Sequence, residues 1–389
     1  MANISVATFT DLNTACQTSN TITVTAPITF TSSITIPAGV TVSISGSTLT
    51  SSTAKQKHFL NNGNLTLTNI TLDGGGGVPV SGASGGGGIS MPDVNAAVSA
   101  LPNPLPSLTL DAGSVIQNCT TDTVGVSSAI YVLFGNLELN GTLITNNYSA
   151  DTTNGGAAIY LNSPSATCVM NAPTVISNNS SVNAGGAIHL GNGANFIMNG
   201  GQILNNSALN NGGGIVMDNF NNNATHNIDP SNTTATTFTM NGGQISGNKS
   251  GSGGGILSDV AATNYPAVIN ISAGEISNNV ANLNGGGIFL RVTTLNMTGG
   301  LVDNNSAVQY NGGGIYIGAE SIATITGTST PTAIPPAAPA TGTPAIVNNT
   351  AAGDGGGLYL TGSETTVTTS DVLISGNIAT NGGGYYVVP

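Results

Sequence analysis

A short glycine-rich phrase recurs along this chain and restricts its possible folds more than any other feature. Its clearest copy is Asn311-Gly312-Gly313-Gly314-Ile315-Tyr316-Ile317. Nine copies follow Ala129, and their last three residues fall at 130–132, 159–161, 188–190, 215–217, 256–258, 288–290, 315–317, 358–360 and 385–387. A second phrase, such as Ile276-Ser277-Asn278-Asn279, precedes many copies, and a third, such as Phe238-Thr239-Met240-Asn241-Gly242-Gly243, lies further upstream. Each unit therefore predicts three short strands.

This repeat favours a solenoid built from strands. Self-similarity at a fixed period is typical of solenoids, and a short unit without helical periodicity indicates one coil of a parallel β-helix. The tightest unit, from Gly285 to Gly312, lies within the roughly 20–50 residues expected of such repeats. We expect an all-β fold: a single right-handed parallel β-helix of roughly 11–13 coils with three long loop insertions. Glycine fills 55 of the 389 positions, and with abundant Thr, Ser and Asn we expect no helix of any length.

The repeat runs through most of the chain, so we expect one domain over residues 1–389. Residues 1–73 form the N-terminal coils, and residues 107–389 form the repeat coils. A Gly- and Pro-rich insertion at 74–106 separates them, and further insertions fall at 218–236 and 318–344. Loops that interrupt a solenoid often carry its binding specificity, although tolerated decoration is an equal alternative.

The alternation of a strand assigns each position of the phrase to one face. Ile315 and Ile317 share a face and point inward, and Tyr316 takes the other face. Coils that stack ~4.8 Å apart place equivalent residues above one another. The paired asparagines, as at Asn278 and Asn279, have structural roles, because Asn tolerates the left-handed region and stacked Asn side chains bond from rung to rung.

Charge is scarce, and its balance excludes several classes of partner. Charged residues make up 5% of the chain, the formal net charge is −12, and the permanent cations are Lys55, Lys57, Lys249 and Arg291. Nucleic acid is excluded as a partner because neutralising phosphates requires clustered Lys and Arg. No run of eighteen apolar residues occurs, so we expect no membrane span.

The three cysteines, Cys16, Cys119 and Cys168, lack the spacing of a metal site. Their odd number leaves at least one unpaired, and we expect buried free thiols. No cofactor or metal is expected.

Two of the phrases are similar to the repeats of a known family. Gly185-Gly186-Ala187-Ile188 and Ile176-Ser177-Asn178-Asn179 resemble the GGA(I/L/V) and FxxN repeats of polymorphic outer membrane proteins and related autotransporter passenger domains. The resemblance covers residues 129–389, and Ile or Val stands here where that family has Phe. It implies a right-handed parallel β-helix displayed on a cell surface as an adhesin, while function depends on sites grafted on the fold.

An enzyme acting on polysaccharides is the alternative for this fold. A lyase requires Arg or Lys beside carboxylates that hold calcium, and a hydrolase requires grouped carboxylates with a cation. Arg291 has no acidic neighbour in its phrase, and Lys249 stands alone in its coil. Asp303 and Asp371 are separated by other rungs, so we interpret them as solvated side chains and predict no enzyme.

The histidines offer two further alternatives. His189 is an outward residue without an acidic partner on its own strand, which favours a surface ladder position over a general base. His226, with Asp218 and Asp229 in the Asn-rich segment, is a weak metal-site alternative on spacing alone.

The middle residues of the phrases form the candidate functional surface. We expect an outward stripe for interaction, made of Tyr131, Tyr160, His189, Val216, Leu257, Phe289, Tyr316, Tyr359 and Tyr386. Such a stripe would stack sugar rings or pack against another rod. The alternative is that a long loop folds back and covers it.

These features predict a non-enzymatic, adhesive or fibre-forming protein at the cell surface or outside the cell. An open last coil presents unpaired N–H and C=O groups, so we expect a homo-oligomer or filament through open coil ends, or a glycan or host-surface ligand. Residues 1–5 lack the basic start and apolar core of a signal peptide, which motivates a virion surface or appendage protein as the alternative.

Overall fold

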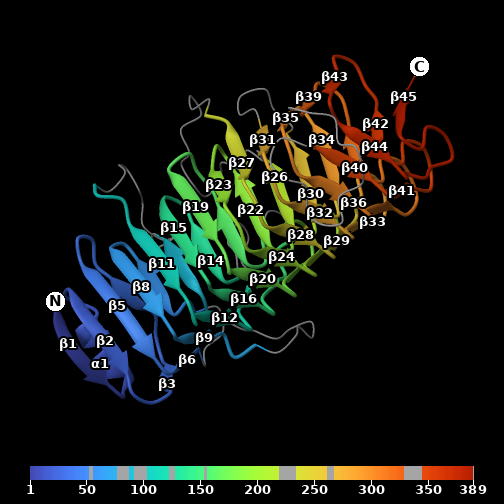
Figure 1. Cartoon of the computed structure of the whole chain (residues 1–389). Helices are drawn as coiled ribbons and strands as arrows, with labels where there is room; N and C mark the ends of the chain where they lie inside the picture. Colours follow the sequence, from blue (N-terminus) through green and yellow to red (C-terminus); the bar gives the residue numbers. More distant parts are fainter. Residues whose placement is uncertain are drawn as a thin grey trace.

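The strands stack into an elongated rod with the two termini at opposite ends (Figure 1). The structure, a computed structural model, describes residues 1–51, 56–76, 87–91, 103–121, 128–152, 156–218, 234–260, 267–327 and 344–388. Four sheets of 13, 12, 12 and 8 strands run along the rod, here called sheets A, B, C and D. Successive rungs pair in parallel, as β31 with β35 and β34 with β38, which confirms a parallel β-helix.

Sheet A contains β1 (Ala2–Val6), β2 (Asn20–Val24), β5 (Thr41–Gly46), β8 (Asn64–Thr68), β11 (Ser107–Asp111), β15 (Gly135–Asn140), β19 (Ala166–Asn171), β23 (Asn195–Met198), β27 (Thr236–Met240), β31 (Ala267–Ile271), β35 (Thr293–Met297), β39 (Ile322–Thr326) and β43 (Thr366–Ser370). Sheet B contains β3 (Ile28–Phe30), β6 (Thr48–Ser51), β9 (Thr71–Asp73), β12 (Val115–Gln117), β16 (Leu143–Thr145), β20 (Val175–Ser177), β24 (Gln202–Leu204), β28 (Gln244–Ser246), β32 (Glu275–Ser277), β36 (Leu301–Asp303), β40 (Ala345–Val347) and β44 (Leu373–Ser375).

Sheet C, which carries the glycine-rich phrase, contains β4 (Ile34–Ile36), β7 (Phe59–Asn61), β10 (Ile89–Met91), β14 (Ile130–Val132), β18 (Ile159–Leu161), β22 (Ile188–Gly191), β26 (Ile215–Asp218), β30 (Ile256–Asp259), β34 (Ile288–Arg291), β38 (Ile315–Ile317), β42 (Leu358–Leu360) and β45 (Tyr385–Val387). Sheet D adds a fourth, two-residue strand to many rungs: β13 (Thr120–Thr121), β17 (Tyr148–Ser149), β21 (Ser180–Ser181), β25 (Ser207–Ala208), β29 (Lys249–Ser250), β33 (Val280–Ala281), β37 (Ser306–Ala307) and β41 (Thr350–Ala351).

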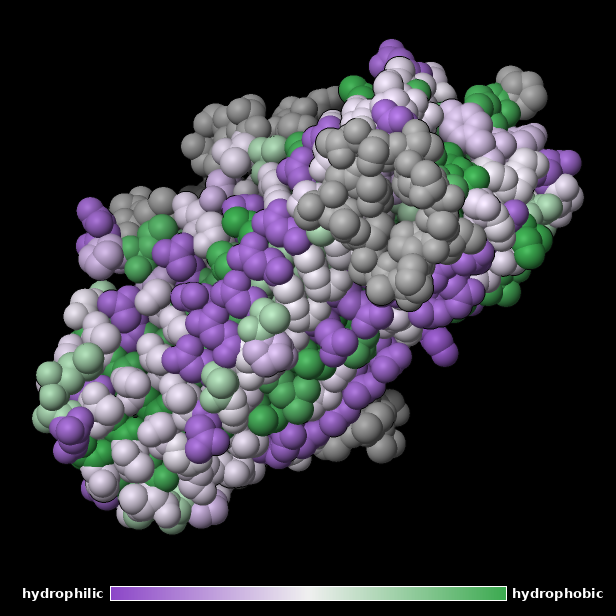
Figure 2. Space-filling view, in the orientation of Figure 1, coloured by the Kyte–Doolittle hydropathy of each residue, from purple (hydrophilic) through white to green (hydrophobic). Residues whose placement is uncertain are grey.

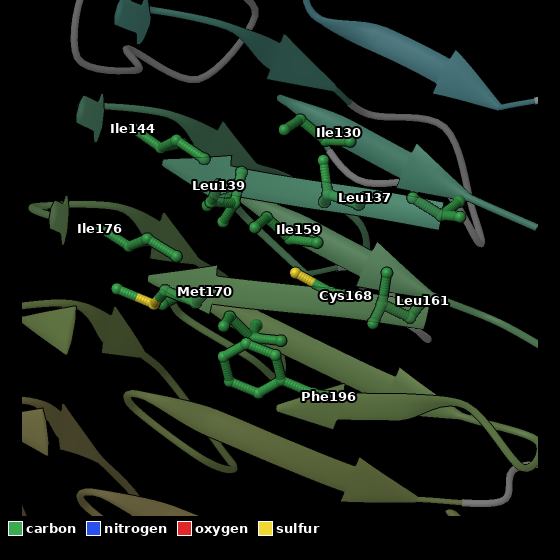
Figure 3. Packing of buried hydrophobic residues seen from close by; sticks show 14 of the residues in the cluster. Ile130, Leu137, Leu139, Ile144, Ile159, Leu161, Cys168, Met170, Ile176 and Phe196 are labelled. Carbon is green, nitrogen blue, oxygen red and sulfur yellow. The ribbon is translucent and has the colours of Figure 1, made fainter. Parts of the chain in front are cut away.

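The predicted register between rungs is confirmed. Ile288 pairs with Ile315, and Phe289 pairs with Tyr316. Both isoleucines are fully buried in the main core, whereas Phe289 packs in a separate cluster outside it. Figure 3 shows the interior packing, with side chains of three sheets pointing into one continuous core. The inward columns are therefore continuous, as the alternation predicts.

Each asparagine of the repeated pair has one of the two predicted roles. The first takes the left-handed conformation, as Asn278 does with φ of 55°, and Gly247 replaces it with φ of 68°. The second is buried, and its amide Nδ2 donates to the Oδ1 of the next asparagine at 2.8–3.0 Å. This asparagine ladder comprises Asn147, Asn179, Asn206, Asn248, Asn279, Asn305, Asn349 and Asn377. The left-handed conformation of the first asparagine and the ladder formed by the second explain why the phrase keeps both residues.

The glycines before sheet C are required by two separate constraints. Gly285 has φ of +67°, a left-handed conformation that L side chains resist. At Gly286, an added Cβ would lie 2.4 Å from the carbonyl oxygen of Gly313 on the next rung. The corner of the rod is thus too tight for any side chain at this position.

Two predicted insertions are wrong in part. Within 74–106, β10 is a full member of sheet C and pairs with β7 and β14. The sequence before it, Gly87-Gly88-Ile89, is a further copy of the glycine-rich phrase, and both glycines have positive φ. Within 318–344, β39 belongs to sheet A and pairs with β35 and β43. Most of the remaining residues of these insertions, and most of 218–236, lie outside the described residues.

The expectation of no helix is also wrong, because α1 (Phe9–Ala15) covers the N-terminal end of the core. The hydroxyl oxygen of Thr8 accepts a hydrogen bond from the backbone N–H of Asp11, which caps the helix. Leu12 is fully buried, and the Phe9 ring lies 5.3 Å from that of Phe30.

The three cysteines are free and buried, as predicted. Burial raises the pKa of the Cys16 and Cys119 thiols to about 12. In the described part of the chain, no helix is long and apolar enough to cross a bilayer.

Candidate interaction face

The outer face of sheet C carries two neighbouring columns of side chains. The aromatic column is the set of middle residues predicted from the sequence, from Tyr131 to Tyr386. Two residues further along each strand lies a second column, in which Gly191, Asp218, Asp259 and Arg291 pair in register. We call these four the polar column. Both columns point away from the core because alternate residues of a strand share a face.

The first half of the aromatic column is buried. Tyr131, Tyr160 and Leu133 form a cluster with Phe134 that is separate from the main core, and Leu105 packs against it. Tyr160 lies 4.3 Å from the His189 ring in a stacked arrangement, and Asn162 donates to the Tyr131 hydroxyl at 3.3 Å. Burial raises the pKa of both tyrosines above their usual range.

Val216 and Leu257 continue this half and are also buried. The prediction of an exposed stripe is therefore wrong from Tyr131 to Leu257. Here the side chains lie on the outer face of the wall but are covered.

The second half of the aromatic column is a stack of four rings. Phe289 lies 4.7 Å from Tyr316 at an interplanar angle of 5°, Tyr316 lies 5.1 Å from Tyr359 at 22°, and Tyr359 lies 5.7 Å from Tyr386 at 8°. Tyr359 is 8% exposed and the other three rings are half-buried. Because neighbouring rings cover each other's faces, the stack presents ring edges and hydroxyls to solvent. Burial raises the pKa of Tyr316 and Tyr359.

His189 is not a surface ladder residue. Its ring is fully buried, and Nε2 lies 2.8 Å from Oδ1 of Asp218, the residue at the end of the next strand in sheet C. The acidic partner of this histidine comes from the neighbouring rung and not from its own strand. Among the described residues, His189 Nδ1 and Asp218 Oδ2 are buried and have no hydrogen-bond partner.

Arg291 also has an acidic neighbour, which the sequence interpretation missed. Its Nε donates to Oδ1 of Asp259 on the preceding rung. Burial raises the pKa of the Asp259 carboxyl, and the hydrogen bond and charge of Arg291 oppose that effect. The hydrogen-bonded pairs His189–Asp218 and Asp259–Arg291 lie on four successive strands, β22, β26, β30 and β34.

The remaining sequence candidates that the structure describes do not form a site. Asp303 accepts a hydrogen bond from Asn348 at 3.0 Å, and Asp371 is exposed. Strand β40 separates their rungs, as predicted. His226 and Asp229 lie outside the described residues. Within the described ranges, no group of three or more His, Cys, Asp or Glu side chains is placed to hold a metal ion.

A buried His–Cys pair inside the rod has no activated nucleophile. His58 Nδ1 accepts a hydrogen bond from the backbone N–H of Gly88 at 2.9 Å, and burial lowers the pKa of the imidazole to about 4. The raised pKa of the nearby Cys119 keeps that thiol protonated. A neutral imidazole and a protonated thiol, both buried, are typical of interior packing and not of catalysis.

Figure 2 shows polar residues in rows that follow the long axis on the visible face, with apolar residues gathered between them. Side chains of one kind thus form columns outside the rod as they do inside it. The unit behind these columns can be compared with known families.

Residues 173–191 match the family model of the Chlamydia polymorphic membrane protein repeat. The matched segment spans β20, β21 and β22, and so includes both the asparagine pair and the glycine-rich phrase. The match confirms the resemblance for this unit. Neither the curated proteins nor the solved structures gave a significant match to the chain.

Proposed function

We propose that this protein is a non-enzymatic rod displayed on the outer surface of a cell, where it adheres to a partner through the stacked half of the aromatic column. The observation that carries the proposal is the row of four stacked rings, Phe289, Tyr316, Tyr359 and Tyr386, of which all but Tyr359 are half-buried. The match to a repeat from a membrane protein family of Chlamydia supports surface display. A location on a virion remains the alternative expectation.

The geometry of the stack favours one kind of partner over another. A sugar ring binds an aromatic side chain through the face of the ring. Within the stack those faces are taken by neighbouring rings, so a glycan gains little from Tyr316 and Tyr359. A protein surface that packs lengthwise against ring edges and hydroxyls fits better. The partner would be an extended protein surface on a host cell or a second copy of the rod.

A second route to self-association involves the last described rung. Ile378, Tyr385 and Val387 are exposed there, at 65%, 42% and 52%. The backbone edges of β43, β44 and β45 offer donors and acceptors to another rung. End-to-end addition of a second copy would cover these exposed side chains and pair with these backbone edges.

The experiment compares wild-type protein with a Tyr316→Ser/Tyr359→Ser variant and with the matched control Thr324→Ala on the outer face of sheet A. Sedimentation velocity and negative-stain images at rising concentration report self-association, and adhesion to immobilised host-cell proteins and glycans reports partner binding. We expect the double variant to lose lateral association or adhesion and the control to retain it. Isolated wild-type rods that adhere to nothing, or an unaffected double variant, would contradict the proposal.

A further inference from the structure

The polar column gathers charge in a chain that contains very little of it. Charged residues make up only 5% of the sequence, yet two aspartates and the single arginine lie on successive strands beside a buried histidine. Asp218 and Asp259 are direct partners in the pairing of β26 with β30. Their carboxylates therefore leave the same face of the sheet about 4.8 Å apart.

One oxygen of this pair lacks a partner. His189 Nε2 lies at hydrogen-bond distance from Asp218 Oδ1, whereas Asp218 Oδ2 is buried and has no hydrogen-bond partner in the part of the chain that the structure describes. The Asp218 side chain is 5% exposed, so this oxygen lies away from bulk solvent. An ionised carboxylate is an acceptor only, and a buried acceptor requires a donor. A bound group that carries N–H or O–H would satisfy this oxygen.

The charges of the polar column indicate which kind of hydrogen-bond donor would fit Asp218 Oδ2. Asp218 and Asp259 supply two negative charges, and Arg291 is the permanent cation of the column. When His189 donates from Nε2, its Nδ1 keeps a lone pair and also requires a donor. A group that donates several hydrogen bonds and carries one positive charge would provide a donor for Asp218 Oδ2 and offset the excess negative charge of the column.

We propose that Asp218 and Asp259 bind a single ammonium group. Its three N–H donors fit Asp218 Oδ2 and the neighbouring carboxylate, and a slender group can enter where exposure increases along the column. Side-chain exposure rises from 5% at Asp218 to 22% at Asp259 and 49% at Arg291. The ammonium would come from a lysine side chain of a partner protein or from an amino sugar. The proposal does not depend on the aromatic stack.

Isothermal titration calorimetry of the full chain tests this site with propylammonium, Nα-acetyl-lysine methylamide and glucosamine as probes. We expect saturable binding of propylammonium that weakens at least tenfold in Asp218→Asn and in Asp259→Asn. The control Asp303→Asn changes a carboxylate outside the column and should bind as the wild type does. A preference for the lysine derivative or for glucosamine would identify the source of the ammonium.

Three results would overturn the proposal. The first is no binding of propylammonium at tens of millimolar, and the second is binding by Asp218→Asn as tight as that of the wild type. The third is displacement of bound propylammonium by potassium ions at the same concentration. Thermal unfolding of each variant checks that it folds. If Asp218→Asn fails to fold, Asp259→Asn decides the outcome, because its side chain is more exposed.

Discussion

The asparagine ladder and the aromatic column run along the same rod and differ in what each member requires of its neighbours. Asn279 donates to Asn305 and to the carbonyl of Ile245, and its own oxygen accepts from Asn248. Neighbouring side chains of the aromatic column mainly pack against one another, and Val216 and Leu257 take the place of rings on two rungs. Obligatory hydrogen bonds keep asparagine on successive rungs of the inner column from Asn147 to Asn377, whereas packing lets the residue type vary along the outer column.

The largest effect is expected inside the ladder. Asn279→Leu strands the backbone N–H and side-chain amide of Asn248 and the carbonyl of Ile245. At about 1–3 kcal/mol for each stranded group, the free energy of unfolding should fall on the order of 4 kcal/mol. Urea denaturation measures it. A loss below that of the matched outer substitution Tyr316→Leu would remove the distinction between the two columns.

A smaller effect separates the two faces of one strand. Ile288→Ala leaves a cavity in the main core and should cost about 3 kcal/mol of unfolding free energy. Phe289→Ala on the outer face should cost less despite its larger side chain, because Phe289 is only half-buried. Denaturation of the pair under one condition measures the difference. Equal losses would show that the outer column is as important to stability as the core.

Alkaline pH should distinguish the buried half of the aromatic column. Burial raises the pKa of Tyr131 above the usual value of about 10, so the unfolded phenol ionises first as pH rises. The contribution of the neutral Tyr131 phenol to the free energy of unfolding is fully present below pH 10. Above pH 10 the free energy of unfolding falls by on the order of 1 kcal/mol per pH unit for one such phenol. Unfolding at pH 9 and pH 11 should show a shallower decline in Tyr131→Phe. An unchanged slope would contradict this cause.

The smallest effect concerns the other asparagine of the pair. Asn278→Ala forces a Cβ-bearing residue to keep φ near 55° and should cost about 1 kcal/mol. Asn278→Gly should be nearly neutral, because Gly247 occupies the equivalent place on another rung. Thermal unfolding of the two variants checks the order. The reverse order would show that the side chain of Asn278 matters more than its backbone conformation.

The sequence predicts the columns because each position of a short phrase recurs once per rung. Ile288 and Ile315 could be placed above one another from their phrases alone. Contacts between rungs were harder to predict. His189 and Asp218 are 29 positions apart, and Arg291 and Asp259 are 32 apart, so a search within one phrase finds neither pair. Insertions of different lengths between strands make these separations irregular.

Exposure was the least predictable property. The alternation of residues along a strand predicts that the Tyr131 side chain points outward. It does not predict that Leu133, Phe134 and Leu105 cover this side chain. Strand β10 was missed for a related reason. Gly87 and Gly88, which precede β10, lie among many other glycines in the sequence. The pairing of β10 with β7 and β14 is what identifies this segment as part of a rung and not of a loop.

The asparagine ladder also gives the rod a direction. Every hydrogen bond from one ladder asparagine to another runs from the side-chain amide to the asparagine of the following rung, so these bonds share one direction and polarise one another along the axis. A gene duplication that copies one rung supplies both the donor and the acceptor that the flanking rungs need. Such an insertion lengthens the molecule by ~4.8 Å without disturbing either side. The reach of this protein is therefore a property that evolution can adjust one coil at a time.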